Sequence, residues 1–573
     1  MHLPNIYGAG AGFGYSGLEG PTGHAYDFVG QLTGDRIGVC FEFTAARHTL
    51  AFTLEPGVRD IEYTLVTNDT LDATITKGGQ SGQLLFMMTE HKALAGRTRF
   101  AKPYVIAPFC EQRTVDGCLV VSMQNGGATA LYVVGDSELR FAFAYDPVSE
   151  QAAIDRAKAA ADTDLESLLA KRVDYFKQLP PCPVHDEFIE RAYYKAFSIL
   201  KYNVQTAEGK IDGLWTTPDR LPHRNMWLWD SCFHTFGLRY IDEGLAARAV
   251  EAVLTQQHDD GFIPHMMTPT GCSDITQPPL LTWAIEQSFA RTGDKCFIER
   301  CLPRLRAYLD WDLKHRDSNN NLLCEWAIEG DPRCRSGESG MDNSQRFDEA
   351  AILDAVDFSC FMKNEYDCLA RLEDALGLTA DADRSRNLAT DISKAVNDLL
   401  WNEKMGIYTD RHMDGRLSDV AAVSGLLPLW AGVATPERAA RMRKFIENPK
   451  MFGTPLPLPS ASANDPEYGT DMWRGGVWMN FTYMVLHGLR RYGMEDLAAD
   501  IATKSVHAMT RWYKQCGSLY EYYHAEDTLP PQMLDRKGRF TPPVDIRRKI
   551  FTIADYGWTA AAFVALLHEG FVK

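Results

Sequence analysis

Two carboxylates, far apart in the sequence, stand in surroundings that suit acid–base chemistry. Asp342 lies within Gly337–Asp348 (GESGMDNSQRFD), where two glycines allow a tight backbone path and small polar residues flank the carboxylate. Glu521 lies within Ser518–His524 (SLYEYYH), among three tyrosines. Aromatic neighbours either desolvate a carboxyl group, which raises its pKa, or hold it by phenol hydrogen bonds. Cleavage of a glycosidic bond needs such a pair of carboxylates.

Both stretches also have a purely structural interpretation. Asp and Gly are ordinary turn residues, so residues 337–348 could form a polar surface loop. Glu521 could lie at a strand edge against which the tyrosines pack. Arg346 stands four residues after Asp342 and could orient that carboxylate or bind a substrate. The residue pattern alone leaves both interpretations open.

Three further stretches place aromatic side chains beside acidic, amide or basic groups. They are Met226–His234 (MWLWDSCFH), Asp274–Pro279 (DITQPP) and Asp471–Trp478 (DMWRGGVW). Tryptophan faces can stack on sugar rings, and a nearby Asp can accept hydrogen bonds from hydroxyl groups; the structural alternative is a buried Trp pair at a helix start. Pro278 suits the first turn of a helix. All five stretches fall between predicted helices or at the starts of them, so we expect them at one mouth of a helical domain.

Apolar residues recur with helical spacing from about residue 183 nearly to the C-terminus. The segments expected to be helical are 186–205, 227–240, 243–257, 277–292, 296–315, 349–377, 379–402, 418–431, 435–446, 474–493, 494–514 and 554–569. Twelve helices fit six αα-hairpins closed into a toroid, an all-α (α/α)6 barrel over 183–573, whereas an open solenoid would show a repeating sequence period, which is not seen. The two longest stretches between helices, about 316–348 and 515–553, contain Asp342 and Glu521, and loops of such length are usually functional.

The N-terminal quarter of the chain has a different pattern. Residues from about 36 to 146 form short runs rich in β-branched and aromatic residues, punctuated by Asn, Gly and Asp. This spacing predicts an antiparallel β-sandwich over 1–146. Residues 147–182 are rich in Ala, Lys, Glu and Leu and are expected to form a helical linker that ends at Pro180–Pro181.

Composition narrows the function classes. The 573 residues carry 59 basic and 76 acidic side chains, a net charge of −17, which argues against nucleic acid or an anionic membrane as partner. The N-terminus has neither a basic start nor an apolar run, and no run of about 18 apolar residues predicts a membrane span. The 13 scattered cysteines form no CxxC pair, which indicates reduced thiols and a cytoplasmic protein. The histidines form no HExxH or HxH pair, so no metal or cofactor is expected, although an oxygen-ligand calcium site stays open.

The five stretches resemble a known family when they are taken together. WLWDSCFH, TQPPLLTWA, ESGMDNSQRFD, WRGGVWMNFTY and YEYYHAED are similar, in order and spacing, to the catalytic domain of glycoside hydrolase family 63. This group includes processing α-glucosidase I, bacterial α-glucosidases, and mannosylglycerate and glucosylglycerate hydrolases. ESGMD also resembles the ESGWD stretch of family 37 trehalases, more weakly. The resemblance covers about 183–573 and implies an (α/α)6 barrel, to which many members add an N-terminal β-sandwich.

The resemblance also implies roles for individual residues. Asp342 matches the general acid of the family and Glu521 the general base that activates water. The candidate substrate-binding residues are Trp227, Trp229, Asp230, Ser231, Gln277, Gly340, Arg346, Trp473 and Arg474. The family inverts the anomeric centre, which implies carboxyl groups about 6.5–9.5 Å apart. Four departures affect specificity. Asn343 follows the acid where many α-glucosidases have Asp, and Trp227 stands where some relatives have other aromatics. Residues 529–531 (LPP) interrupt the region after the base, and compact mannosylglycerate hydrolases lack the N-terminal extension.

The expected function is that of an inverting, exo-acting α-glycosidase, of α-glucosidase or α-mannosidase type, on a small oligosaccharide or glycoside. A trehalase-like disaccharide hydrolase is one alternative. A sugar epimerase or lyase on the same fold is another, because His223, His234, His265 and His524 lie in the loops concerned. A third is a non-catalytic carbohydrate-binding protein. The sequence leaves the sugar, the linkage, the aglycone and the oligomeric state open.

Overall fold

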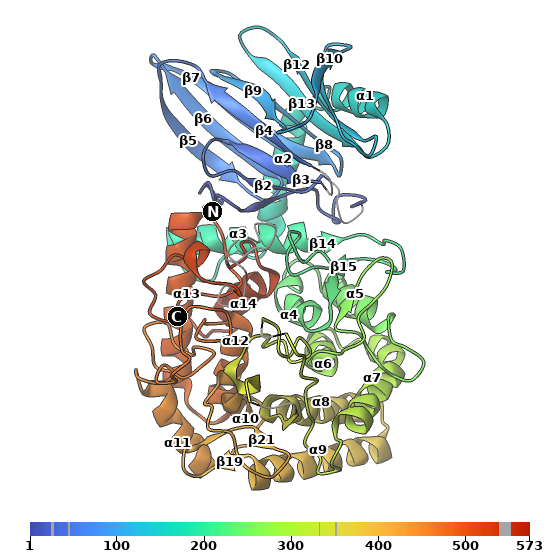
Figure 1. Ribbon diagram of the computed structural model, residues 1–573, viewed down its shortest axis with the longest axis vertical. Coiled ribbons are helices and arrows are strands. Elements are labelled where there is room, and N and C mark those ends of the chain that lie inside the picture. Colours follow the sequence, from blue (N-terminus) through green and yellow to red (C-terminus); the bar gives the residue numbers. More distant parts are fainter. Residues whose placement is uncertain (24–27, 44–45, 332, 350–351, 538–551, 573) are drawn as a thin grey trace. The chain divides into compact units, whose positions relative to one another are not determined.

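The computed structural model describes residues 1–23, 28–43, 46–331, 333–349, 352–537 and 552–572. The chain forms two compact units (Figure 1). The first, here called the β unit, comprises Met1–Glu208, Asp219–Arg224 and Thr510–Leu519. The second, the helical unit, comprises Gly209–Pro218, Asn225–Met509 and Tyr520–Lys573. An antiparallel β region therefore precedes a helical region, as the sequence predicts.

The β unit contains two antiparallel sheets. The larger has eight strands in the order β10 (Gln112–Val115), β11 (Cys118–Ser122), β12 (Ala128–Val134), β13 (Leu139–Asp146), β8 (Ala93–Thr98), β7 (Gln80–Glu90), β6 (Thr70–Lys77) and β5 (Val58–Val66). The smaller has five strands in the order β1 (Gly12–Phe13), β2 (Gly30–Leu32), β3 (Gly38–Glu42), β4 (Arg47–Leu54) and β9 (Ala101–Ile106). The strand region predicted over 36–146 is confirmed, and β1 and β2 extend it toward the N-terminus.

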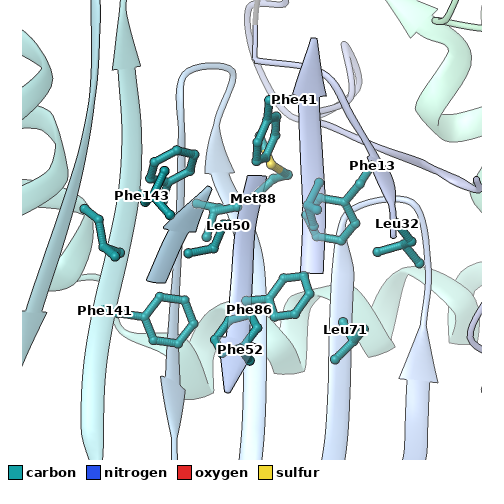
Figure 2. Close-up of a cluster of buried hydrophobic side chains, with 14 of the residues drawn as sticks. Phe13, Leu32, Phe41, Leu50, Phe52, Leu71, Phe86, Met88, Phe141 and Phe143 are labelled. Atoms are coloured by element: carbon teal, nitrogen blue, oxygen red, sulfur yellow. The ribbon is translucent and has the colours of Figure 1, made fainter. Parts of the chain in front are cut away.

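The larger sheet is buried on both faces, and β7 shows why. Leu84, Phe86 and Met88 alternate with Leu85 and Met87, and all five side chains are fully buried. The first three join a core between the two sheets that also includes Phe13, Phe41, Phe52, Phe141 and Phe143 (Figure 2). The other two join a second cluster on the opposite face. Period-two alternation therefore serves two cores, each large aliphatic or aromatic side chain contributing about 1.5–3 kcal/mol.

Helix α1 (Glu150–Ala161) covers the outer face of this sheet. Ser149 caps it by accepting a hydrogen bond from the Ala152 amide. The buried side of the helix, which includes Ala153 and Ala157, packs on alanines of the sheet such as Ala142. Small side chains on both elements let the backbones approach closely. Helix α2 (Leu165–Gln178) follows, so two helices lie within the segment 147–182 that is expected to be helical. The predicted division of the chain at residues 146 and 182 stays a prediction.

A buried histidine links the two sheets of the β unit. His48 on β4 has its Nδ1 atom 2.7 Å from the hydroxyl of Thr129 on β12, and burial lowers the pKa of His48 to about 4. The unfolded chain binds a proton at this residue below about pH 6.5, whereas the folded chain does not. The contribution of His48 to the free energy of unfolding is therefore fully present above about pH 6.5 and is lost as the pH falls from 6.5 toward 4.

We expect this histidine to make the β unit acid-sensitive. Between pH 7 and pH 5 it should remove about 2 kcal/mol from the free energy of unfolding. The measurement is urea unfolding of wild type and His48→Gln at both pH values, with exposed His185→Gln as the matched control. The loss should be about 2 kcal/mol smaller in His48→Gln only. An equal loss in all three proteins would show that His48 titrates normally in the fold.

Twelve α-helices follow α2 in the described residues, one for each segment expected to be helical. Helix α3 (Glu187–Asn203) belongs to the β unit. The others are α4 (Leu228–Leu238), α5 (Glu243–Leu254), α6 (Leu281–Thr292), α7 (Lys295–Arg316), α8 (Val356–Ala375), α9 (Thr379–Leu399), α10 (Leu427–Trp430), α11 (Pro436–Glu447), α12 (Met479–Arg491), α13 (Glu495–Cys516) and α14 (Gly557–His568). Alternate helices pack in a closed series: α4 on α6, α6 on α8, α8 on α10, α10 on α12, α12 on α14, and α14 on α4 (Figure 1).

The segment predicted to be helical over 418–431 differs most from expectation. Only Leu427–Trp430 is α-helical, after a 3-10 turn at Val423–Leu426. Pro428 has no amide hydrogen, so it fits the first turn of α10. In a helix that began at residue 418 it would lie in the interior and interrupt the hydrogen bonds. Gly425 lies so close to the Tyr408 carbonyl that a Cβ atom would overlap it. Close backbone approach therefore shortens this helix, and hydrophobic periodicity does not report such an approach.

Short two-stranded ladders connect several loops of the helical unit. They are β16 (Met226–Trp227) with β17 (Met266–Met267), β18 (Leu353–Asp354) with β21 (Arg411–His412), and β19 (Trp401–Asn402) with β20 (Ile407–Tyr408). Two further short strands are β14 (Val204–Gln205) and β15 (Trp215–Thr216). The first ladder brings the loop before α6 to the residues that start α4, both of which contain candidate site residues.

Candidate active site

Glu521 is buried and fixed at both its backbone and its side chain. Its amide donates to the Ile553 carbonyl at 2.9 Å, and its own carbonyl accepts from Trp558 Nε1 at 3.2 Å. Arg536 reaches both carboxylate oxygens, with Nε 2.9 Å from Oε2 and Nη2 3.3 Å from Oε1. Burial opposes the charge of Arg536, but the Glu521 carboxylate raises the pKa of the guanidinium. This fork is a charge-assisted pair that holds both oxygens of the Glu521 carboxylate in place.

Asp342 is less enclosed than Glu521. Its side chain is 22% exposed, against 3% for Glu521. Its backbone carbonyl accepts hydrogen bonds from the amides of Arg335 at 2.7 Å and Ser336 at 3.3 Å, which close the loop on itself. Lys537 Nζ lies 2.7 Å from Asp342 Oδ2. The two candidate catalytic carboxylates therefore have different surroundings, and consecutive residues of the chain, Arg536 and Lys537, pair with them.

Side chains next to the two carboxylates join their loops. The Asn343 amide group accepts from the Trp473 backbone at 3.1 Å through Oδ1 and donates to the Asp471 carbonyl at 3.3 Å through Nδ2. The Trp473 ring stacks on Trp478, with ring centroids 3.7 Å apart, and Trp478 stacks on Tyr522 at 4.6 Å. Asn343 directly follows Asp342 in the sequence, and Tyr522 directly follows Glu521. Three predicted motifs thus meet in one place, although the first lies more than a hundred residues before the other two.

Gly340 has the backbone conformation and the space that only glycine accepts. Its φ is +70°, and a Cβ atom on it would overlap the indole ring of Trp229. Trp229 is itself 2% exposed and lies edge-on to Trp558. The ring of Trp229 therefore packs directly on the loop that carries Asp342.

We expect Gly340→Ala to lower both stability and activity. The left-handed conformation costs an alanine about 1–2 kcal/mol, and the overlap must displace either Trp229 or the loop. A displacement of about 1 Å at a reacting group can cost on the order of 100-fold in rate. The measurement is the melting temperature and kcat/KM of this variant. Gly330→Ala is the control, since a Cβ there meets nothing within 4 Å. Wild-type values for Gly340→Ala would contradict the tight fit.

Several predicted substrate-binding residues are used to start helices. The amide of Trp229, in the first turn of α4, donates to Gln277 Oε1 at 3.2 Å. The Ser231 hydroxyl donates to the Trp227 carbonyl at 2.7 Å. Asp230 is 2% exposed, and Trp227 is only half-buried, edge-on to His265. Of these residues, Trp227 has the indole most open to a ligand, and the roles of all of them in substrate binding stay predictions.

Remote side chains also cap two other helices of the closed series. Glu365 accepts from the amides of Thr282 at 2.6 Å and Trp283 at 2.8 Å, at the start of α6. Asp410 accepts from the Val356 amide at 3.0 Å, at the start of α8. These acceptors satisfy amides that no neighbouring side chain caps. The first turns of α4, α6 and α8 are therefore held by residues from other elements.

Arg346 has a structural environment. Its side chain is 1% exposed and lies between Asp357, with Nη1 2.5 Å from Oδ2, and Asp410, with Nε 2.7 Å from Oδ2. Each carboxylate receives two contacts from the guanidinium. Asp410 also caps α8, so Arg346 ties the Asp342 loop to the start of that helix. Its predicted contact with a substrate stays a prediction.

Arg474 faces a cavity next to the site. Its Nη2 atom lies 2.7 and 2.9 Å from the two carboxylate oxygens of Asp348, and Nη1 lies 3.4 Å from Glu467. The cavity has a volume of about 270 Å³, and its lining includes Asp471 and Asp535. Asp471 accepts the Lys537 amide at 2.6 Å, so the cavity borders the segment that pairs with the two carboxylates.

Sequence reasoning missed some residues of the site. Arg536 and Lys537 resemble ordinary charged loop residues, and no spacing signal marks them. Glu338 is fully buried and accepts from the Thr276 amide at 3.1 Å, the Ala327 amide at 2.7 Å and Arg316 at 2.7 Å. The one sequence signal for Glu338 is that it begins the ESGMD stretch that ends at Asp342. A buried carboxylate with three donors fixes the loop that precedes Asp342.

No group of three His, Cys, Asp or Glu side chains that could hold a metal ion occurs in the described part of the chain. Likewise, none of the described helices has both the length and the apolar character needed to cross a membrane.

The sequence matches a family of known hydrolases. The model of the mannosylglycerate hydrolase MGH1-like glycoside hydrolase domain matches residues 223–530, more than half of the 573 residues. Mannosylglycerate hydrolase MGH1 of Selaginella moellendorffii is 23% identical over 413 residues, which cover 57% of this chain and 82% of that protein. The chain therefore belongs to the MGH1-like glycoside hydrolase family, and it is a glycosidase.

Solved structures share the fold. The GH63 mannosylglycerate hydrolase from Thermus thermophilus in complex with Tris has a TM-score of 0.53 at 21% identity, covering 65% of this chain and 99% of its own. Neutral trehalase Nth1 from Saccharomyces cerevisiae has a TM-score of 0.50 at 14% identity, covering 68% and 80%. A bacterial glucoamylase complexed with acarbose has a TM-score of 0.62 at 11% identity, covering 99% and 95%. The motif-based resemblance to family 63 is confirmed, and the trehalase shares the fold.

Proposed function

We propose that this glycosidase is an inverting, exo-acting α-glycosidase with Asp342 as general acid and Glu521 as general base. The main support is that one aromatic stack and one Asn side chain join the loops of two carboxylates with different surroundings. A general base needs a fixed carboxylate, and the Arg536 fork holds both oxygens of Glu521. An acid must reach the leaving oxygen, and Asp342 is the more exposed of the two.

The proposed reaction is a single displacement at the anomeric carbon. Asp342 donates its proton to the glycosidic oxygen as the bond from that oxygen to the anomeric carbon breaks. A water molecule attacks the opposite face of the sugar and gives its proton to Glu521 as the new carbon–oxygen bond forms. An α-glycoside then releases a β-sugar. Both proton transfers use side chains, so we propose that no cofactor is required.

The proposed architecture is the (α/α)6 toroid. The closed series of α4, α6, α8, α10, α12 and α14 supports an inner ring, with α5, α7, α9 and α11 as helices of the outer layer. Asp342 precedes α8 and Glu521 precedes α14, so both lie on segments that lead into helices of this series. A pocket closed at one end by such a ring favours removal of a terminal sugar. This is why we propose exo action.

The proposed substrate is a small α-linked glycoside of mannose or glucose. Relatives named mannosylglycerate hydrolase make α-mannosylglycerate and α-glucosylglycerate the first compounds to test. The fold shared with a trehalase adds α,α-trehalose. Of the four histidines on which the epimerase alternative rests, His234 is fully enclosed beside Thr216, and burial lowers its pKa to about 3. Such a histidine cannot reach a sugar in an open pocket.

The test is proton NMR of the purified protein with these three glycosides. Release of the β-anomer as the first product supports an inverting α-glycosidase, and the compound hydrolysed identifies the sugar and the linkage. Release of the α-anomer would contradict inversion. Conversion of a sugar into its epimer, or formation of an unsaturated sugar, would replace the proposal with the epimerase or lyase alternative.

A further inference from the structure

We propose that Lys537 is a positioning residue that keeps Asp342 ionised in the ligand-free enzyme and must leave this carboxylate before the acid can act. The inference rests on the proposed function, in which Asp342 is the general acid. It concerns the proton that Asp342 has to carry, and it assigns a role to a residue that lies outside all five sequence motifs.

The contact itself is close and partly enclosed. Lys537 Nζ lies 2.7 Å from Asp342 Oδ2, and the two side chains are 24% and 22% exposed. The backbone of Lys537 is held separately, because its amide donates to Asp471 Oδ1 at 2.6 Å and its φ is +58°. A fixed backbone places the ammonium group at the carboxylate, while the flexible four-carbon side chain allows the ammonium group to turn away.

Two other titratable groups that act on Asp342 are Cys334 and His265. Burial raises the pKa of the Cys334 thiol, and the Asp342 carboxylate raises it further. Burial lowers the pKa of His265, although Asp342 opposes this effect. Both groups are therefore uncharged at neutral pH. Lys537 is the group among these three that brings a permanent positive charge to Asp342.

This arrangement conflicts with the role of a general acid. A lysine ammonium beside an aspartate stabilises the carboxylate and lowers the pKa of the acid. Asp342 therefore enters the reaction cycle without the proton that the glycosidic oxygen must receive. When substrate displaces the ammonium group, Asp342 takes up one proton from solvent. The balanced step is ionised enzyme plus substrate plus one proton giving the protonated complex.

A place for the displaced ammonium group exists nearby. Asp471 holds the Lys537 backbone and lines the cavity of about 270 Å³, together with Glu467 and Asp535. Its Oδ1 atom accepts the Lys537 amide, so this carboxylate lies beside the backbone of the same lysine. Lys537 can therefore exchange one carboxylate for another without losing its countercharge, which lowers the cost of releasing Asp342.

The test compares two pH profiles of the wild-type enzyme. The alkaline limb of kcat/KM reports the acid in the free enzyme, and that of kcat reports it in the complex. We expect the kcat limb to lie at least about one pH unit higher, a tenfold difference in proton affinity. The substrate is α-mannosylglycerate, α-glucosylglycerate or trehalose, whichever the enzyme hydrolyses, because their leaving groups need protonation. Coincident limbs in an active enzyme would overturn the inference and leave the proposed function intact.

Variants of Lys537 give the second measurement. In Lys537→Met the kcat/KM limb should move up by about one pH unit, toward the unchanged kcat limb. Lys537→Arg keeps the charge and should keep the wild-type limb. Lys504→Met removes the same charge from an exposed pair with Asp500 and controls for net charge. An unshifted limb in a folded, active Lys537→Met enzyme overturns the inference, whereas a wild-type enzyme that hydrolyses none of the three glycosides overturns the proposed function as well.

Discussion

Glu521→Gln should lower kcat by about 10²–10⁴-fold on every substrate, whatever its leaving group. The amide cannot take a proton from water, so the attacking nucleophile is no longer activated. A better leaving group should not restore the rate, because the missing step is the activation of water on the opposite face of the sugar. The measurement is kcat for an alkyl α-glycoside and for the corresponding p-nitrophenyl α-glycoside, with loss of similar size expected for both.

Azide makes this prediction sharper. A small anionic nucleophile needs no base, so azide should restore turnover of p-nitrophenyl glycoside by Glu521→Gln and form the β-glycosyl azide from an α-glycoside. Glu526→Gln, an exposed residue five positions later, is the matched control and should behave as wild type. An α-configured azide would contradict the assignment of Glu521 as the base of an inverting enzyme.

The folding cost of this variant has to be measured beside its activity. Glu521 and Arg536 form a largely buried pair, with 3% and 11% of their side chains exposed. Removing one charge from such a pair costs up to about 3–5 kcal/mol. We therefore expect a lower melting temperature together with a cooperative transition. The azide product is formed only by a folded active site, so its formation shows both that the variant is folded and that the missing step is activation of water.

The sequence predicts the elements well because each has a local signal. Apolar–polar alternation in β6 and helical periodicity in α4–α9 follow directly from which faces are buried. The prediction is weakest where a contact from elsewhere decides the outcome. Gly425 lies against the Tyr408 carbonyl and shortens α10, and no local pattern encodes that approach.

The candidate site shows the same limit for side-chain roles. Motif matching finds Asp342, Glu521 and Trp229 because their stretches are distinctive. It does not reveal that Gln277 caps α4 or that Arg346 lies between two buried carboxylates. These roles depend on contacts such as Gln277 with Trp229 and Arg346 with Asp410. The two residues of each contact lie more than 40 positions apart in the sequence. Several polar residues in the motifs therefore hold the site in shape.

This view changes how the departures from the family pattern are understood. Asn343 replaces the Asp that follows the acid in many α-glucosidases, and its side chain both accepts from Trp473 and donates to the Asp471 carbonyl. An ionised Asp could only accept. The amide is thus a connector between two loops of the site, and the difference alters the positioning of the Asp342 loop rather than the acid itself.

Asp342→Asn should separate the acid from the base by its dependence on the leaving group. An alkyl alcohol leaves only with a proton, so kcat on α-mannosylglycerate or trehalose should fall by about 10²–10⁴-fold. p-Nitrophenolate leaves without one, so its α-glycoside should lose far less. Asp331→Asn, a partly exposed residue of the same loop paired with Arg333, is the matched control.

The pH profile makes the assignment of Asp342 independent of the size of the loss. The alkaline limb of kcat, which arises when the acid gives up its proton, should disappear in Asp342→Asn, because the variant has no proton to lose at this position. The acid limb, which reports protonation of Glu521, should remain. Asparagine also removes the partner of Lys537, so the variant keeps the cation without the carboxylate. An alkaline limb that persists unchanged, or equal losses for both leaving groups, would place the general acid at another residue.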